Sequence, residues 1–230
     1  MAQKLIDLSQ EIFQGMPIYP LHQKTFIFQN ISHDECKKKL KSKLGFATNN
    51  LLINEHAGTH CDAVYEYNPL GQTIDQMSLD YFWGPAICLD VSHVKYDKYI
   101  TKNDLNQALQ KAGLEFQQGD IVLLYTGTWN RLYGTDEYLI KYTGLTREAA
   151  EWLADQGVVN IGVDSPSIDH PDDPDFVGHG VCAERNLSNT EHLANLDKVA
   201  GKRFLYFGLP LKIRGGSGSP IRAIAILNDQ

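Results

Sequence analysis

Residues 121–125 read Ile-Val-Leu-Leu-Tyr, an unbroken apolar run that decides the fold class of this chain. A run without polar alternation is typical of a strand that is covered on both faces. Thr146 can then cap a helix that extends through Gln156, with Gly157 at its end, and residues 158–163 form a second apolar run. Strand, helix and strand in this order predict a right-handed crossover between parallel strands, and therefore an α/β fold.

Apolar stretches outside this unit predict further strands, at residues 5–8, 86–91, 204–207 and 221–227. Thr101 and Asp104 form a capping-box signature before a helix over residues 104–111, which Gly113 closes. Residues 21–50 are polar and give no clear prediction. No composition break or Pro/Ser-rich linker divides the 230 residues, so a single domain over residues 1–230 is expected.

Composition narrows the class of function. With 43% hydrophobic residues the chain can bury a full core, and its net charge of −7 argues against nucleic-acid binding. The basic run at residues 37–43 is interpreted as a solvated face. No apolar run reaches transmembrane length, and the first residues lack the features of a signal peptide. The scattered cysteines indicate free thiols and a cytoplasmic protein without membrane attachment: Cys36, Cys61, Cys88 and Cys182.

The strongest functional signal is the stretch His-Ala-Gly-Thr-His-Cys-Asp-Ala-Val-Tyr-Glu at residues 56–66. Its four candidate ligands all have even numbers, so in an extended chain their side chains point to one face: His56, His60, Asp62 and Glu66. Imidazole and carboxylate groups are common metal ligands. The type and direction of these side chains therefore predict a metal site, in preference to two structural histidines on a polar loop.

The spacing also constrains the backbone. Positions two apart in a strand are separated by roughly 6.6 Å, so His60 and Asp62 could share an ion directly. His56 is four positions from His60 and could not, unless the chain folds back between them. Gly58 tolerates the positive φ that such a bend needs. We interpret the segment as a strand joined to a bent loop.

A second set of ligands is expected downstream. Residues 164–170 follow a predicted buried strand, which is where α/β proteins tend to place functional loops. Beyond this loop come His179 and, twelve positions later, Glu191. Alone, this pair is a weak signal.

Together with the first motif, the pair resembles the cyclase-like metal-dependent hydrolases, the family that includes bacterial kynurenine formamidase and isatin hydrolase. That family shows His-x-Gly-Thr-His-x-Asp-x-Pro-x-His, followed far downstream by a His and a Glu twelve apart. Both motifs match in register, through His56, Gly58, Thr59, His60, Asp62, His179 and Glu191. Residues 6–20, 162–169 and 209–220 are similar to the family's opening, central and closing blocks.

The resemblance implies a layered β/β/α fold of the swivelling type and a pair of divalent ions, zinc or manganese. It assigns His56, His60 and Asp62 to one ion, with Asp62 and Glu191 bridging to a second ion that His179 completes. Tyr19 would lie against a small-molecule substrate. The resemblance also suggests a homodimer or homotetramer.

Two positions depart from the family pattern: Val64 replaces the proline, and Glu66 replaces the last histidine. The resemblance identifies that histidine as the general acid/base. A glutamate can move a proton if its pKa is raised towards neutrality, whereas nearby dications would lower its pKa. Glu66 is therefore expected to be either a carboxylate base acting on water or an additional ligand, which would favour oxygen-preferring ions such as Mn²⁺.

The favoured interpretation is hydrolysis of an amide or cyclic amide C–N bond by metal-activated water. N-formylkynurenine, from tryptophan catabolism, is a candidate substrate, and Thr59 is a candidate polar contact near the ions. Two alternatives stay open. One is a non-catalytic metal- or ligand-binding protein that has lost the acid/base group. The other is a mononuclear iron enzyme that uses His56, His60 and Asp62.

The remaining histidines are interpreted as surface or structural residues: His22, His33, His93, His170 and His192. Among them, His192 is expected to matter most, because it adjoins Glu191. His170 belongs to a loop that could approach the site.

Overall fold

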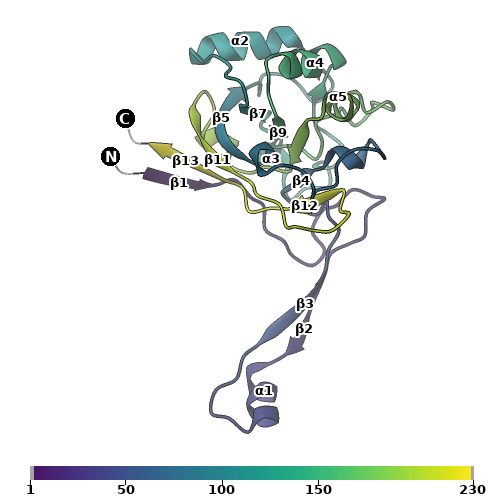
Figure 1. The fold of residues 1–230 in the computed structure, drawn as a ribbon, viewed down its shortest axis with the longest axis vertical. Helices are drawn as coiled ribbons and strands as arrows, with labels where there is room; N and C mark the ends of the chain where they lie inside the picture. The colour runs from purple at the N-terminus through teal and green to yellow at the C-terminus, as the bar shows by residue number, and fades with distance from the viewer. Residues whose placement is uncertain (1–2, 229–230) are drawn as a thin grey trace.

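The body of the protein is built on a curled, mixed sheet, and the computed structural model describes residues 3–228. In space the strands follow the order β1-β13-β11-β5-β7-β9-β10-β4-β12 (Figure 1). In that order they span Gln3–Asp7, Ile224–Asn228, Arg203–Phe207, Trp83–Asp90, Ile121–Tyr125, Asn160–Val163, Ser188–Glu191, His60–Asp62 and Gly218–Pro220. β5, β7, β9 and β10 are parallel neighbours, and the strands on either side of them pair antiparallel.

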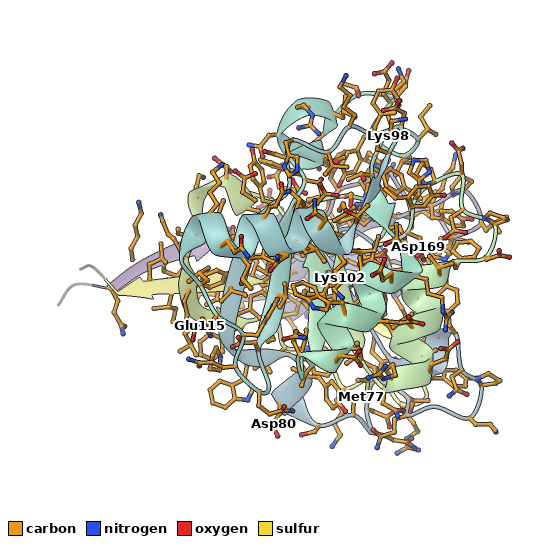
Figure 2. All side chains as sticks on the ribbon, turned by 90° about the horizontal axis from the view of Figure 1, so that it is seen from above. Met77, Asp80, Lys98, Lys102, Glu115 and Asp169 are labelled. Atoms are coloured by element: carbon orange, nitrogen blue, oxygen red, sulfur yellow. The ribbon has the colours of Figure 1, made fainter. Side chains whose placement is uncertain are left out.

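Three helices lie on one side of this sheet: α2 (Lys102–Ala112), α4 (Arg147–Asp155) and α5 (Val177–Arg185) (Figures 1 and 2). The predicted caps are present. Thr101 and Asp104 form the capping box of α2, and Thr146 caps α4. The shorter elements are α3 (Thr128–Leu132), the 3₁₀ turns Val64–Glu66, Leu79–Tyr81 and Leu196–Lys198, and a small sheet of β6 (Tyr99–Ile100) with β8 (Gly144–Leu145).

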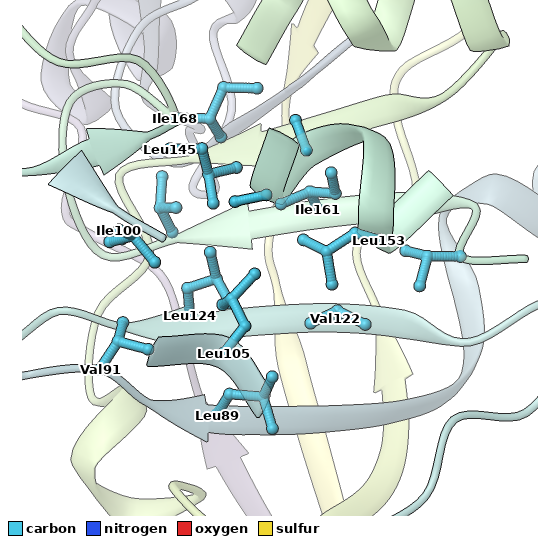
Figure 3. Packing of buried hydrophobic residues seen from close by; sticks show 14 of the residues in the cluster. Leu89, Val91, Ile100, Leu105, Val122, Leu124, Leu145, Leu153, Ile161 and Ile168 are labelled. Atoms are coloured by element: carbon cyan, nitrogen blue, oxygen red, sulfur yellow. The ribbon is translucent and has the colours of Figure 1, made fainter. Parts of the chain in front are cut away.

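The apolar run of β7 is buried on both faces, as predicted. Val122 and Leu124 pack into the cluster beneath the helices (Figure 3). Ile121 and Leu123 face the opposite way, into a cluster that includes Tyr206 of β11 and side chains of β1 and β13. The curled end of the sheet thus covers the face that the helices leave free. The predicted α/β class is confirmed, including the parallel β7–α4–β9 crossover.

A hairpin arm, residues 26–52, extends away from the body (Figure 1). It consists of β2 (Phe26–Ile31), α1 (His33–Leu40) and β3 (Thr48–Leu52), with β2 and β3 paired antiparallel. Ser32 and Glu35 form a capping box for α1. The basic run at residues 37–43 lies on α1 and the turn after it and is exposed, as expected. The sequence did not reveal these strands, because they have no buried face to impose a pattern.

Candidate metal centre

The first motif forms a tight turn followed by a short strand. Gly58 has a φ of +65°, so the predicted bend lies where only glycine is unstrained. This bend brings the rings of His56 and His60 to 5.0 Å between centroids. His60 and Asp62 then lie on β4, and both are buried. The bend precedes the strand, and the chain after the strand turns into the 3₁₀ helix that carries Glu66.

The second set lies directly beside the first. β10 pairs antiparallel with β4, so that Glu191 is opposite His60. Glu191 Oε2 lies 3.6 Å from His60 Nε2. His179 on α5 completes the group, with its Nε2 3.2 Å from Glu191 Oε1 and 3.8 Å from Asp62 Oδ2. Residues far apart in the sequence therefore converge, as the resemblance implied.

These side chains form two groups that share Asp62. In each group the potential ligand atoms lie within 4.8 Å of one another: His56, His60 and Asp62 in one, and Asp62, His179 and Glu191 in the other. Each group has the composition of a transition-metal site, with imidazole nitrogen and carboxylate oxygen.

In each of the three histidines, the ring nitrogen that faces away from the shared carboxylates contacts another group. His60 Nδ1 donates to Gly58 O at 2.8 Å, and His56 Nε2 lies 2.9 Å from Ser217 Oγ. His179 Nδ1 contacts Asp169 Oδ2 at 2.5 Å. In each case the opposite nitrogen faces the shared carboxylates. Metal-binding histidines are typically oriented in this way, so the residues fit a bound cation.

Asp169 reaches His179 because the loop before α5 passes close to Gly144. A Cβ at position 144 would lie 1.9 Å from the backbone nitrogen of His170 and 2.1 Å from the carbonyl carbon of Asp169. Only glycine fits there. Asp169 itself is buried, is labelled in Figure 2, and also accepts a hydrogen bond from Gly178 N at 2.5 Å.

The charged groups of this cluster shift one another's pKa values. Burial opposes ionisation of Asp62, but the adjacent imidazoles of His60 and His56 hold its pKa well below the usual value. Burial likewise acts to lower the pKa of His179, but Asp169, Asp62 and Glu191 raise it well above the usual value. The centre therefore attracts positive charge, which a bound cation can supply in place of protons.

Glu66 also reaches the centre. Its Oε1 lies 3.6 Å from His56 Nδ1, whereas its buried Oε2 has no hydrogen-bond partner among residues 3–228. Burial, together with the negative charge of Asp62, raises the pKa of Glu66 to about 8. Glu66 was expected to point towards the ligands from an extended strand, but it reaches them from a 3₁₀ turn.

A cavity of about 280 Å³ opens over this cluster. Tyr19, which the resemblance assigns to substrate contact, lines this cavity, and so does His170. His192 also lines the cavity, and burial lowers its pKa to about 3. Further lining residues are aromatic: Tyr67, Tyr142 and Phe176. Tyr67 stacks on His179 with 4.4 Å between ring centroids.

Two sequence-based interpretations need correction. His22, interpreted as a surface or structural residue, lies at the site: it lines the cavity, and its ring lies 5.3 Å from that of His56. No local pattern marks it, because it lies in an irregular segment. The Thr59 hydroxyl, expected to be a polar contact near the ions, instead bonds to two other segments of the chain. It donates to His192 O at 2.6 Å and accepts from Gln10 N at 2.8 Å. Thr59 therefore joins segments around the site.

Comparisons with known proteins agree with this geometry. A family model described as "Putative cyclase" matches residues 6–170. This chain belongs to that family. The kynurenine formamidase of Paracidovorax citrulli is 32% identical over 174 residues, covering 76% of this chain and 77% of the relative. That of Salinibacter ruber is 29% identical over 220 residues, covering 96% of each chain.

Solved structures support the fold assignment. An isatin hydrolase bound to the product analogue thioisatinate has a TM-score of 0.87 at 24% identity, covering 99% of this chain and 93% of its own. Isatin hydrolase A from Ralstonia solanacearum has a TM-score of 0.85 at 26% identity, with coverages of 98% and 92%. The predicted family and the layered cyclase fold are confirmed. In the part of the chain that the structure describes, no helix is long and apolar enough to span a membrane.

Proposed function

We propose that this protein hydrolyses the C–N bond of an amide or cyclic amide at the centre described above. The observation that carries the proposal is the pair of ligand groups that share Asp62 at an aromatic-lined cavity. Relatives named kynurenine formamidase cover most of the chain and bear out a metal-dependent amide hydrolase. The protein therefore belongs to the reaction class predicted from the sequence.

For the cofactor we propose two divalent ions, zinc or manganese, held by His56, His60, Asp62, His179 and Glu191. Such ions, when bound, lower the pKa of a coordinated water and polarise a carbonyl group. The protein orients the three histidines through Ser217, the Gly58 carbonyl and Asp169. Glu66 is close enough to His56 to act on a water near the ions or to join their ligands, and its unpartnered oxygen supports either role.

N-formylkynurenine is our first candidate for the substrate. Its aromatic ring suits the rim of the cavity, where Tyr19, Tyr67, Tyr142 and Phe176 gather. Its formamide group is small enough to approach the buried ligands at the other end. A cyclic amide fused to an aromatic ring, such as isatin, has the same combination of features and is the second candidate.

The experiment is metal analysis of protein purified without chelators, followed by a hydrolysis screen of formamides, lactams and lactones. We expect at least one divalent ion per chain and turnover of an aromatic formamide or lactam. Bound metal without any hydrolysis would favour the non-catalytic alternative. Iron dependence with oxygen consumption would favour the mononuclear iron enzyme, although that enzyme needs no second group such as His179 and Glu191.

We also propose that the protein is a cytoplasmic homo-oligomer, a dimer or tetramer, in which the arm contacts a second copy. Large apolar side chains of the arm are exposed: Phe26, Phe28, Leu40, Leu44, Phe46, Leu51 and Leu52. An isolated two-stranded hairpin is marginally stable in water. The arm carries five lysines and two carboxylates, a net charge of +3; because the whole chain is −7, the remainder is −10. This complementarity favours another copy of the chain as the partner.

A further inference from the structure

His192 occupies a constrained position at the cavity, beside the proposed ligands. Its φ is +57°, in the left-handed region that residues other than glycine seldom adopt. Its backbone is fixed on both sides, because its N–H donates to Ser165 O at 2.9 Å and its carbonyl accepts from the Thr59 hydroxyl at 2.6 Å. Backbone outliers of this kind cluster at functional sites.

A chain of hydrogen bonds sets which ring nitrogen of His192 carries the proton. Gln10 Nε2 donates to the Tyr138 hydroxyl oxygen at 2.6 Å. That hydroxyl lies 2.9 Å from His192 Nδ1. A tyrosine hydroxyl has one hydrogen, and among residues 3–228 its oxygen has two hydrogen-bond partners, the Gln10 amide nitrogen, which can only donate, and His192 Nδ1, so this hydrogen goes to Nδ1. Nδ1 is then an acceptor, so the ring hydrogen of the neutral imidazole is on Nε2.

The Nε2 atom is free to meet a substrate. It has no hydrogen-bond partner among residues 3–228, and the His192 ring lines the cavity. The ring centroid lies 5.7 Å from that of His60, so the donor is next to the proposed metal centre. Tyr138, by contrast, is fully buried and can act only through His192.

We infer that the Nε2–H group of His192 donates a hydrogen bond to the carbonyl oxygen of the substrate, with Tyr138 and Gln10 as positioning residues. The inference rests on the proposed amide hydrolysis. When water adds to the carbonyl carbon, the π pair of the C=O bond moves to this oxygen, and the donor stabilises the resulting charge. The attacking water gives up a proton to the carboxylate proposed as the base, Glu66; when the pair returns, the C–N bond breaks, and the leaving nitrogen keeps the bonding pair and takes that proton back from Glu66. His192 keeps its own proton throughout.

The first test removes the donor. His192→Phe keeps a planar ring, and His192→Gly removes the ring while fitting the positive φ, so that backbone strain cannot explain a shared effect. We expect both variants to lose about 100-fold in kcat, as is typical for one oxyanion donor, with KM changed less than about threefold and metal content unchanged. The control is His93→Gly at an exposed histidine. Wild-type kcat in His192→Gly would overturn the inference.

The second test reverses the hydrogen-bond chain. In Gln10→Glu a carboxylate would accept the Tyr138 hydrogen. The hydroxyl oxygen would then accept from His192 Nδ1, so that Nδ1 becomes the protonated nitrogen and Nε2, without a hydrogen, can no longer donate. We expect a fall in kcat of at least about tenfold. Tyr138→Phe should also lower kcat, whereas Tyr133→Phe, whose ring packs edge-on against Tyr138 at 5.4 Å between centroids, should not.

The ring proton can be read directly from ¹⁵N chemical shifts of the histidine side chains. We expect a protonated Nε2 at His192 in the wild type and a protonated Nδ1 in Gln10→Glu. A wild-type ring protonated on Nδ1 would overturn the inference even if the enzyme is active. Conversely, absence of amide hydrolysis by the metal-loaded wild type would contradict the proposed function, while this measurement still decides the proton position.

Discussion

The metal centre and the arm differ in how far contacts within the chain pair their polar groups and cover their apolar side chains. At the centre, nearly every polar atom of the ligands has a partner from another element, as the contacts of His179 with Asp169 and Glu191 illustrate. In the arm, every residue of β3 is exposed, and Cys36 is a rare buried side chain. The ligands of the centre are thus held by contacts within one chain, whereas the arm leaves its apolar side chains uncovered, which is why we propose a second copy of the chain as its partner. Changes at the centre should alter metal binding and turnover, and changes in the arm should alter association.

The largest effect is expected from Asp62→Asn, because Asp62 belongs to both ligand groups. The substitution removes a negative charge while keeping shape. We expect metal content to fall and kcat/KM to drop by more than the roughly 100-fold that the loss of an outer partner can cause. Elemental analysis and a hydrolysis assay on the same preparation measure this. Full metal content and activity in Asp62→Asn would contradict a shared ligand.

Asp169→Asn tests the support of His179 rather than a ligand. Losing the carboxylate leaves the Nδ1–H of His179 with a weaker acceptor, so metal affinity should fall by about 10–100-fold. Competition with a chelating dye measures the affinity. Asp172→Asn is a matched control in the same loop, since the Asp172 side chain is 90% exposed, and it should bind metal like the wild type.

Glu66→Gln separates the two roles proposed for this residue. Either role predicts a loss of turnover of at least tenfold, about 1.4 kcal/mol in the transition-state free energy. If Glu66 is a base acting on water, metal content should stay constant. If it is a ligand, metal affinity should fall as well. Unchanged turnover with intact metal would remove Glu66 from the mechanism.

Sequence could predict the centre where the signal was local or carried by the family motif. His56, Gly58, His60 and Asp62 lie within seven positions, so their spacing alone required a bend. His179 and Glu191 followed from the resemblance. The contacts that orient these residues could not be predicted, because Ser217 is 161 positions from His56 and nothing local links them.

The strands of the fold likewise divide into those that the sequence could predict and those that it could not. Residues 121–125 were predictable because a strand buried on both faces leaves an unbroken apolar run. The strands of the arm were not, since Asn49 and Asn50 on β3 are exposed and no burial pattern distinguishes them from a loop. Whether residues 1–230 act as a single domain stays a prediction.

Phe28→Ser is expected to have the smallest effect on the stability of the single chain. The same variant tests whether the arm contacts a second copy. Phe28 and Phe26 share one face of β2, whereas Gln29 points to the other face. Because Phe28 is 56% exposed, its loss should change the unfolding free energy of the monomer by less than about 0.5 kcal/mol. If the face contacts a second copy, sedimentation should show a shift towards monomer for Phe28→Ser and not for Gln29→Ser. Equal masses for both variants and the wild type would show that this face of the arm has another use.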